Sequence, residues 1–212
     1  MISLPLADEV FLIGHDENSG KAHISDGALD TVLAGAVLGE LLYAGRLSLS
    51  DETLVVADSD ARTGDSARDA ALVEIHKQVE RYPVRAWLEH LRTDIRPMIA
   101  ERLIRVGLIE RVEARVMLKT SIRYPFLDRI AAAAPLARLR YMLDHPHNLD
   151  EHSAALAALV VAGSLEFVFG GASAREVRQG LANLAGQCHP QVRLLVAGLE
   201  SAVAALVMRA GR

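Results

Sequence analysis

The feature that most limits how this chain can fold is the apolar stretch LAGAVLGELLYAGRLSL, residues 33–49. A helix that spans a bilayer needs roughly 20 consecutive apolar residues. Here Glu40 and Arg46 interrupt a run that is already too short, so the sequence argues against a membrane span. Residues 28–44 instead predict a helix that is apolar on all sides, which is typical of the centre of a helical fold.

The ends and the packing of this central helix can also be predicted. Ser25 or Asp26 can cap its N-terminus, because their side-chain oxygens accept hydrogen bonds from free backbone N–H groups. Gly45 can end the helix, since glycine readily adopts the conformation found after a last helical turn. Gly35 and Gly39 predict a notch where the backbone of another helix approaches closely.

Glu40 is the one carboxylate within the apolar stretch 33–49. A buried carboxylate without a cation or hydrogen-bond donors would cost several kcal/mol. We therefore expect Glu40 to be an internal ion-pair partner, and the sequence leaves the identity of its cation open.

The composition favours a helical core. Apolar residues make up 51% of the 212 residues and aromatic residues only 4%, so the core must be aliphatic and rich in alanine. Such a core favours helix packing over a β-sandwich. Cys188 is the only cysteine, which excludes an internal disulfide and a cysteine-based zinc site. A net charge of −4 argues against broad nucleic-acid binding, which requires a basic face.

Apolar spacing and turn residues together predict a mostly α fold with two small β-hairpins, in a single domain over residues 1–212. The predicted elements, in chain order, are a short helix or strand at 8–16, the central helix at 28–44, a hairpin at 47–56, a helix from Asp65 to Pro83, a short helix at 84–91, a separate helix at 94–107 with Pro97 in its first turn, a second hairpin at 108–125, and helices from Phe126 onward. The N-terminus lacks the basic segment of a secretory signal, so a cytoplasmic location is expected.

Three segments, taken in order, resemble one known family. They are LADEVFLIGHDENSGK at 6–21, the central stretch at 33–49, and IRPMIAERLIRVGLIE at 95–110, with RYPFLD at 123–128 after the second hairpin. This order and the patterns GxxLxELxxxGRLxL and ERLxxxGLIE resemble the Golgi phosphoprotein 3 family, also called GPP34, whose bacterial members occur mainly in actinobacteria. The resemblance covers nearly the whole chain and implies a single GPP34-type helical domain with no catalytic activity and no cofactor.

The resemblance also implies a function at membranes. Eukaryotic members bind phosphatidylinositol 4-phosphate and hold glycosyltransferases in the Golgi. By that likeness the chain is expected to be a peripheral membrane protein or adaptor. Its expected partners are an anionic phospholipid surface at the inner face of the cell membrane and a protein client.

The family's phosphate site uses a tryptophan, an arginine in the central helix, and two arginines three residues apart. The corresponding residues here are Ser25, Ala34, Thr93 and Arg96, of which only Arg96 keeps the family residue. Arg92 lies one turn before Arg96, so Arg96 and Arg92 are the candidate lipid-phosphate-binding residues. Both lie near the predicted start of the helix at 94–107, where free N–H groups and the helix dipole favour a phosphate.

The second hairpin is a candidate for membrane insertion or for assembly. Its expected tip, Val116, Met117 and Leu118, is apolar and lies between Arg115 and Lys119. An apolar tip with basic flanks can enter an anionic bilayer. The same strands can instead pair with a second copy of the chain through an exposed edge, giving a homo-oligomer.

Two other functional classes stay open. The pairing of helices with hairpins resembles winged helices, which would make the chain a DNA-binding protein. The negative net charge, however, leads us to expect no nucleic-acid partner. The loop DHPHNLDEH, residues 144–152, gathers His145, His147 and His152 and would suit a metal-dependent enzyme. It lacks the helical spacing of a metal motif, and Asp150 is expected to cap the next helix.

Overall fold

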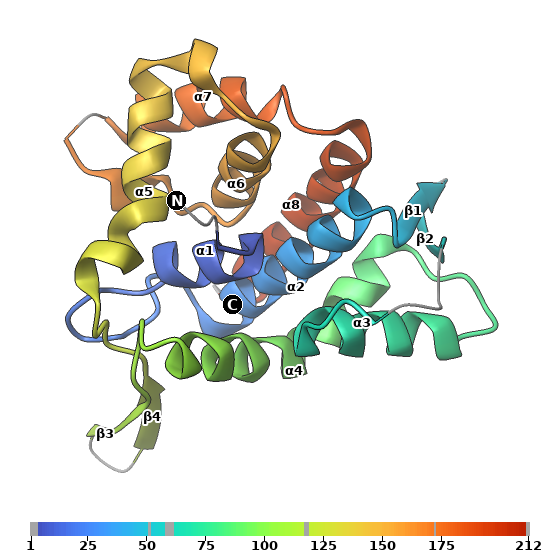
Figure 1. Ribbon diagram of the computed structural model, residues 1–212, viewed down its shortest axis with the longest axis horizontal. Coiled ribbons are helices and arrows are strands. Elements are labelled where there is room, and N and C mark those ends of the chain that lie inside the picture. The colour runs from blue at the N-terminus through green and yellow to red at the C-terminus, as the bar shows by residue number, and fades with distance from the viewer. Residues whose placement is uncertain (1–3, 51, 58–61, 117–118, 172, 211–212) are drawn as a thin grey trace.

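The computed structural model describes residues 4–50, 52–57, 62–116, 119–171 and 173–210 (Figure 1). The fold is mostly α, as the sequence predicts, with two separate two-stranded antiparallel hairpins. The elements are α1 (Leu6–Ile13), α2 (Asp26–Tyr43), β1 (Leu47–Ser50), β2 (Thr53–Val56), α3 (Ser66–Lys77), α4 (Val84–Arg105), β3 (Val112–Val116), β4 (Lys119–Arg123), α5 (Arg129–Asp144), η1 (Pro146–Asn148), α6 (Glu151–Ala162), η2 (Glu166–Phe169), α7 (Ala174–Ala185) and α8 (Pro190–Ala210).

Helix α2 is the central helix of the fold and contacts α1, α3, α4, α6 and α8 (Figure 1). Its N-terminus is capped by Ser25, whose side chain accepts a hydrogen bond from the Ala28 N–H at 3.4 Å. After its last turn Gly45 adopts a φ of +65°, a conformation that favours glycine. The predicted position and both predicted ends of the central helix are therefore confirmed.

The predicted notch on α2 is occupied by α8. A Cβ built at Gly35 would lie 2.8 Å from Leu199 Cδ2, and one built at Gly39 would lie 3.7 Å from Leu195 Cδ2. Among the described residues, α8 alone is long and apolar enough to span a membrane by length and composition. In this fold it instead packs along α2, with Leu195 and Leu199 fully buried.

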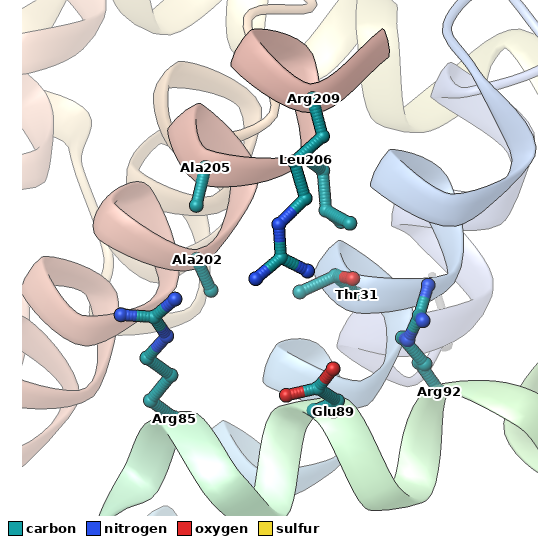
Figure 2. A pocket seen from close by; sticks show the side chains of 8 residues that line it. All are labelled: Thr31, Arg85, Glu89, Arg92, Ala202, Ala205, Leu206 and Arg209. Atoms are coloured by element: carbon teal, nitrogen blue, oxygen red, sulfur yellow. The ribbon is translucent and has the colours of Figure 1, made fainter.

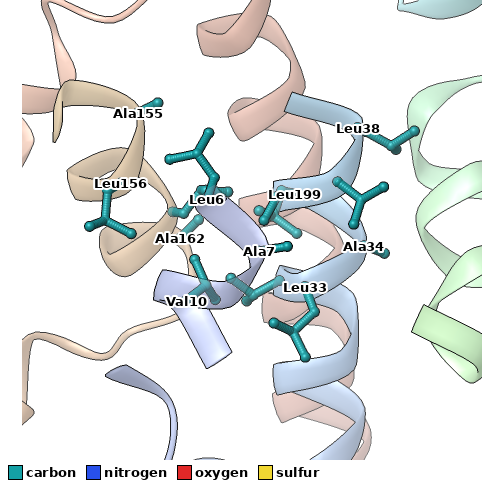
Figure 3. Packing of buried hydrophobic residues seen from close by; sticks show 14 of the residues in the cluster. Leu6, Ala7, Val10, Leu33, Ala34, Leu38, Ala155, Leu156, Ala162 and Leu199 are labelled. Carbon is teal, nitrogen blue, oxygen red and sulfur yellow. The ribbon is translucent and has the colours of Figure 1, made fainter. Parts of the chain in front are cut away.

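Helix α1 lies between α2 and α6, and Figure 3 shows Leu6, Ala7 and Val10 in this layer. The helix also buries two carboxylates, and each of them meets an arginine. Asp8 accepts hydrogen bonds from the Nε and Nη2 atoms of Arg102, and Glu9 accepts two from Arg138. Charges buried in this way need such paired donors, because an unpaired carboxylate in the core is strongly unfavourable.

Two predicted boundaries are wrong. The helix predicted from Asp65 to Pro83 ends at Lys77. The short helix at 84–91 and the helix at 94–107 are a single continuous helix, α4, with Pro97 in its interior. Proline removes one backbone hydrogen bond and normally kinks or ends a helix. Here Leu88, Leu91, Ile95 and Ile99 form an unbroken buried stripe across the proline, and their burial outweighs the missing bond.

Both predicted hairpins are present. In the second, Val112 faces Arg123 and Val116 faces Lys119. The β3–β4 hairpin follows α4 and extends away from the helical body, at the lower left of Figure 1. This position makes it the most protruding β element of the described chain.

Candidate functional site

Arg92, on the N-terminal half of α4, points into a pocket where three helices meet (Figure 2). Helix α4 contributes Arg85, Glu89 and Arg92, and α2 contributes Thr31. Helix α8 contributes Arg209 together with Ala202, Ala205 and Leu206. The pocket therefore brings together three guanidinium groups and one carboxylate; we call it the arginine pocket.

The charged side chains of the arginine pocket make no close ion pairs within the described part of the chain. Within the described part of the chain, no hydrogen bond or ion pair joins Arg85, Glu89, Arg92 or Arg209 to another protein group. The Nε atom of Arg92 is inaccessible to solvent and has no hydrogen-bond partner. The Thr31 hydroxyl already donates to the Gly27 carbonyl at 2.7 Å. The lining thus carries three cations and one anion, and the carboxylate of Asp30 beside it interacts electrostatically with Arg92.

The pocket is also narrow. Its volume of about 20 Å³ holds little more than one water molecule. A larger anion would have to move the arginine side chains outward. These side chains are long and flexible, so the movement costs mainly rotamer freedom.

Arg96 occupies a different environment from Arg92. Its Nε donates to Asp30 Oδ1 at 2.5 Å, its Nη1 to Asp26 Oδ1 at 2.7 Å, and its Nη2 to the Asp26 carbonyl at 2.7 Å. Burial raises the pKa of Asp30, and the neighbouring Arg96 guanidinium acts in the opposite direction. All three guanidinium nitrogens of Arg96 are thus engaged within the fold.

The prediction that Arg96 lies in a first helical turn is wrong, because α4 begins at Val84. The backbone N–H groups around Arg96 are therefore used in the helix and are not free to bind phosphate. Of the other positions that correspond to the family's phosphate site, Ser25 is the N-cap of α2 and Ala34 is completely buried. The structure brings neither of them to the arginine pocket.

The tip of the β3–β4 hairpin lies at the edge of what the structure describes. Met117 and Leu118 are outside the described residues, and of Val116 only its place at the end of β3 is described. Exposed apolar side chains are found at the base of the hairpin and just after it. They include Val112, Ile122, Leu127 and Ile130, the last of which is 89% exposed.

Glu40 has the buried environment that its sequence position predicts. It is 8% exposed, its Oε1 accepts a hydrogen bond from the Ala7 N–H at 2.8 Å, and its Oε2 lies 3.6 Å from Arg68 Nε. Burial raises the pKa of Glu40, whereas the Ala7 hydrogen bond and Arg68 act in the opposite direction. The predicted ion-pair partner is therefore Arg68, and Glu40 also satisfies a free N–H at the start of α1.

The histidine loop does not converge on a common point. His152 Nε2 lies 2.9 Å from Glu9 Oε2, while His145 stacks on Tyr141 with its Nδ1 3.2 Å from the Tyr141 carbonyl. Across the described ranges, no group of three or more His, Cys, Asp or Glu side chains is arranged to hold a metal ion. Asp150 caps α6 by accepting from the Ser153 N–H at 2.7 Å, as predicted.

Sequence reasoning missed two of the three arginines of the arginine pocket, Arg85 and Arg209. Arg85, Glu89 and Arg92 follow helical spacing, which places them on one face, so Arg85 could have been found from this pattern. Arg209 is more than one hundred residues away in the sequence, and no local pattern joins it to α4.

The chain matches a known protein family over nearly its whole length. The family model described as Golgi phosphoprotein 3 (GPP34) matches residues 6–206, from the start of α1 to near the end of α8. This match includes both hairpins and every helix except the last four residues of α8. The chain therefore belongs to the Golgi phosphoprotein 3 (GPP34) family.

Proposed function

We propose that this chain is a peripheral membrane protein that binds anionic phospholipid headgroups, with Arg92 as the central phosphate ligand. The observation that carries the proposal is that Arg85, Arg92 and Arg209 line one pocket and, within the described residues, make no ion pair. Guanidinium groups bind phosphate through paired, charge-assisted hydrogen bonds. A headgroup phosphate would relieve the repulsion among these cations and supply the acceptor that Arg92 Nε lacks.

The environments of Arg92 and Arg96 assign the two candidates different roles. Arg96 already has two carboxylates as acceptors, so a phosphate would have to displace Asp26 and Asp30. Among the described residues Arg92 makes no hydrogen bond to a carboxylate; Asp30 acts on it only electrostatically and is hydrogen-bonded to Arg96. Arg92 is therefore the proposed ligand, and Arg96 supports the fold beside it.

The β3–β4 hairpin would make a second contact with the membrane, beside that of the arginine pocket. The hairpin protrudes from the body (Figure 1), and exposed Ile122 and Val112 lie on its strands. Val116, Met117 and Leu118 at its tip would then enter the bilayer. The lipid is an anionic phospholipid such as phosphatidylinositol 4-phosphate at the cytoplasmic face, where the chain would hold a protein client.

Vesicle co-sedimentation tests the arginine pocket. Vesicles of phosphatidylcholine alone are compared with vesicles that also contain phosphatidylserine or phosphatidylinositol 4-phosphate. We expect Arg92→Gln and Arg209→Gln to lower the affinity for anionic vesicles about tenfold, the equivalent of one lost charge-assisted hydrogen bond. Arg175→Gln is the matched control, because Arg175 is an exposed arginine on α7 outside the pocket.

Two outcomes would contradict the pocket proposal. Equal loss of binding in Arg175→Gln would show that only total charge matters. Equal sedimentation with neutral and anionic vesicles would show that the chain does not recognise the headgroup phosphate. Binding to duplex DNA with a steep salt dependence, and none to vesicles, would favour the winged-helix function instead.

Met117→Asp tests the hairpin contact. We expect weaker vesicle binding with an unchanged melting temperature, because a charged side chain resists entry into the bilayer. A variant that binds vesicles as well as the unaltered chain, but elutes as a smaller particle in size-exclusion chromatography, would assign the hairpin to assembly with a second copy.

A further inference from the structure

Three aromatic rings line a second pocket, on the surface between the end of α3 and the start of α4. The pocket has a volume of about 230 Å³ and is lined by Tyr82, Trp87 and His90, with Gln78 and Ala86. Trp87 is the only tryptophan in a chain with 4% aromatic residues. We propose that this aromatic pocket binds a small quaternary ammonium group, an activity separate from phosphate binding.

The rings are arranged as walls around Trp87. The Tyr82 and Trp87 ring centroids are 6.1 Å apart with their planes at 88°, and those of Trp87 and His90 are 5.9 Å apart at 76°. Trp87 is 4% exposed whereas Tyr82 is 37% exposed and His90 is exposed, so Trp87 forms the floor of the pocket. Steeply inclined rings around one space are the arrangement in which aromatic faces attract a cation.

Two carboxylates contact the outer rings of the pocket. The Tyr82 hydroxyl donates to Glu80 Oε2 at 3.2 Å, and His90 Nε2 lies 3.5 Å from Glu74 Oε2. Lys77 offsets the charge of Glu74 through an ion pair at 2.9 Å. Within the described residues Glu80 makes no ion pair, and Arg81 lies next to it in the lining of the neighbouring pocket. A hydroxyl that donates to a carboxylate is polarised and makes its ring more electron-rich.

The lining selects a quaternary ammonium group over a primary one. No carboxylate lines the pocket itself. A lysine-type ammonium would lose its hydrogen bonds to water on entry, and the rings would not replace them. A trimethylammonium group has no N–H to satisfy and presents methyl groups to the rings. A water molecule occupies about 30 Å³ in the liquid, so the pocket volume of about 230 Å³ holds several waters. A trimethylammonium group would displace these waters.

The aromatic pocket is independent of the arginine pocket. Residues 86, 87 and 90 of α4 line the aromatic pocket, and residues 85, 89 and 92 line the arginine pocket. At 3.6 residues per turn the two sets point roughly 150° apart around the helix axis. A single small headgroup cannot occupy both pockets. A failure of phosphate binding at the arginine pocket would therefore not contradict ammonium binding at the aromatic pocket. A failure of ammonium binding would likewise not contradict phosphate binding.

Because Trp87 is the only tryptophan, intrinsic fluorescence of the full chain reports on the pocket directly. We expect choline and tetramethylammonium to change the emission saturably, at roughly millimolar concentration. Ammonium chloride at equal ionic strength and 3,3-dimethylbutanol, the uncharged isostere of choline, should have no saturable effect. An equal response to the uncharged isostere, or no response to choline, would overturn the proposal.

Variants at Tyr82 separate ring chemistry from folding. Tyr82→Ala should weaken choline binding about tenfold, and Tyr82→Phe should keep most of it, because the ring face remains. Tyr141→Ala is the matched control, since Tyr141 is also surface-exposed, at 49% against 37% for Tyr82, but lies on α5, stacked against His145. Choline binding by Tyr82→Ala equal to that of the unaltered chain, in protein with an unchanged circular dichroism spectrum, would rule the pocket out.

The source of the ammonium group can be read from the same assay. Saturation by free choline without a response to phosphatidylcholine vesicles would assign a soluble ligand. A response to these vesicles that free choline displaces would assign a lipid headgroup. A vesicle response that free choline does not displace would contradict binding at Trp87.

Discussion

Gly35 of α2 and Leu199 of α8 touch so closely that a Cβ at position 35 would lie 2.8 Å from Leu199 Cδ2. One turn further along α2, a Cβ at Gly39 would lie at an ordinary contact distance of 3.7 Å from Leu195 Cδ2. The two glycines therefore have different physical roles. Gly35 is required by packing, whereas Gly39 has space for a methyl group.

This difference predicts opposite effects of the same substitution. Gly35→Ala should lower the free energy of unfolding by about 1–3 kcal/mol, because Leu199 is fully buried and has little room to move. Gly39→Ala should be neutral or stabilising by up to about 1 kcal/mol, since alanine is the better helix former. Chemical denaturation of both variants measures the effects. Equal destabilisation would show that the α2–α8 contact is uniformly tight.

Glu40 joins α1, α2 and α3 through one carboxylate. Glu40→Ala leaves the Ala7 N–H without its acceptor and Arg68 without its anion, so we expect a loss of about 2–4 kcal/mol. Glu40→Gln keeps an acceptor for Ala7 and should cost less, because burial already disfavours the charge at this position. The melting temperatures of the two variants give the comparison. If Glu40→Gln were as unstable as Glu40→Ala, the negative charge of Glu40 would be its dominant contribution to stability.

Arg96 is expected to stabilise the fold through its two carboxylate partners. Arg96→Gln leaves Asp30 partly buried without its cation and should lower the free energy of unfolding by about 1–3 kcal/mol. Adding Asp30→Asn should recover part of this loss, because the uncompensated carboxylate is then removed. Denaturation of the single and double variants tests the coupling. Strictly additive losses would mean that the pair contributes no coupled stability.

Local signals in the sequence predicted much of the fold. Ser25 and Asp150 were identified as helix caps because a cap depends on residues only three positions apart. The continuity of α4 was missed because proline is a strong local signal for a helix boundary. The buried stripe that outweighs it depends on contacts with α2 and other distant helices.

The candidate site could be predicted only in part, for the same physical reason. Arg92 was identified, but Arg209 reaches the same pocket only through the packing of α8 on α2 and α4. Arg96 looked free because its partners, Asp26 and Asp30, lie 70 and 66 residues away. Sequence spacing shows which face of a helix a side chain occupies, while the partner it meets depends on tertiary packing.

His15 is buried at the end of α1 and makes stability depend on pH. Its Nδ1 donates to the Phe11 carbonyl at 2.7 Å, and its ring stacks on Phe11 and meets Tyr124 edge-on. Burial lowers its pKa from 6.5 to about 4, and the charges that face it are those of Arg96, His23 and Asp26. The folded chain therefore holds this imidazole neutral at pH values where the unfolded chain would protonate it.

The sign of the effect follows from this difference in proton binding. The stabilisation from His15 is fully present above pH 6.5 and is lost as the pH falls toward about 4, by roughly 3 kcal/mol. His15→Phe keeps a ring beside Phe11 but cannot titrate, so its stability should change less over this range. Asp8, Asp30 and Glu40, whose pKa values are raised by burial, titrate in both proteins and cancel in the difference. Denaturation curves at half-unit pH steps give that difference, and parallel profiles for the two proteins would show that His15 is protonated without loss of the fold.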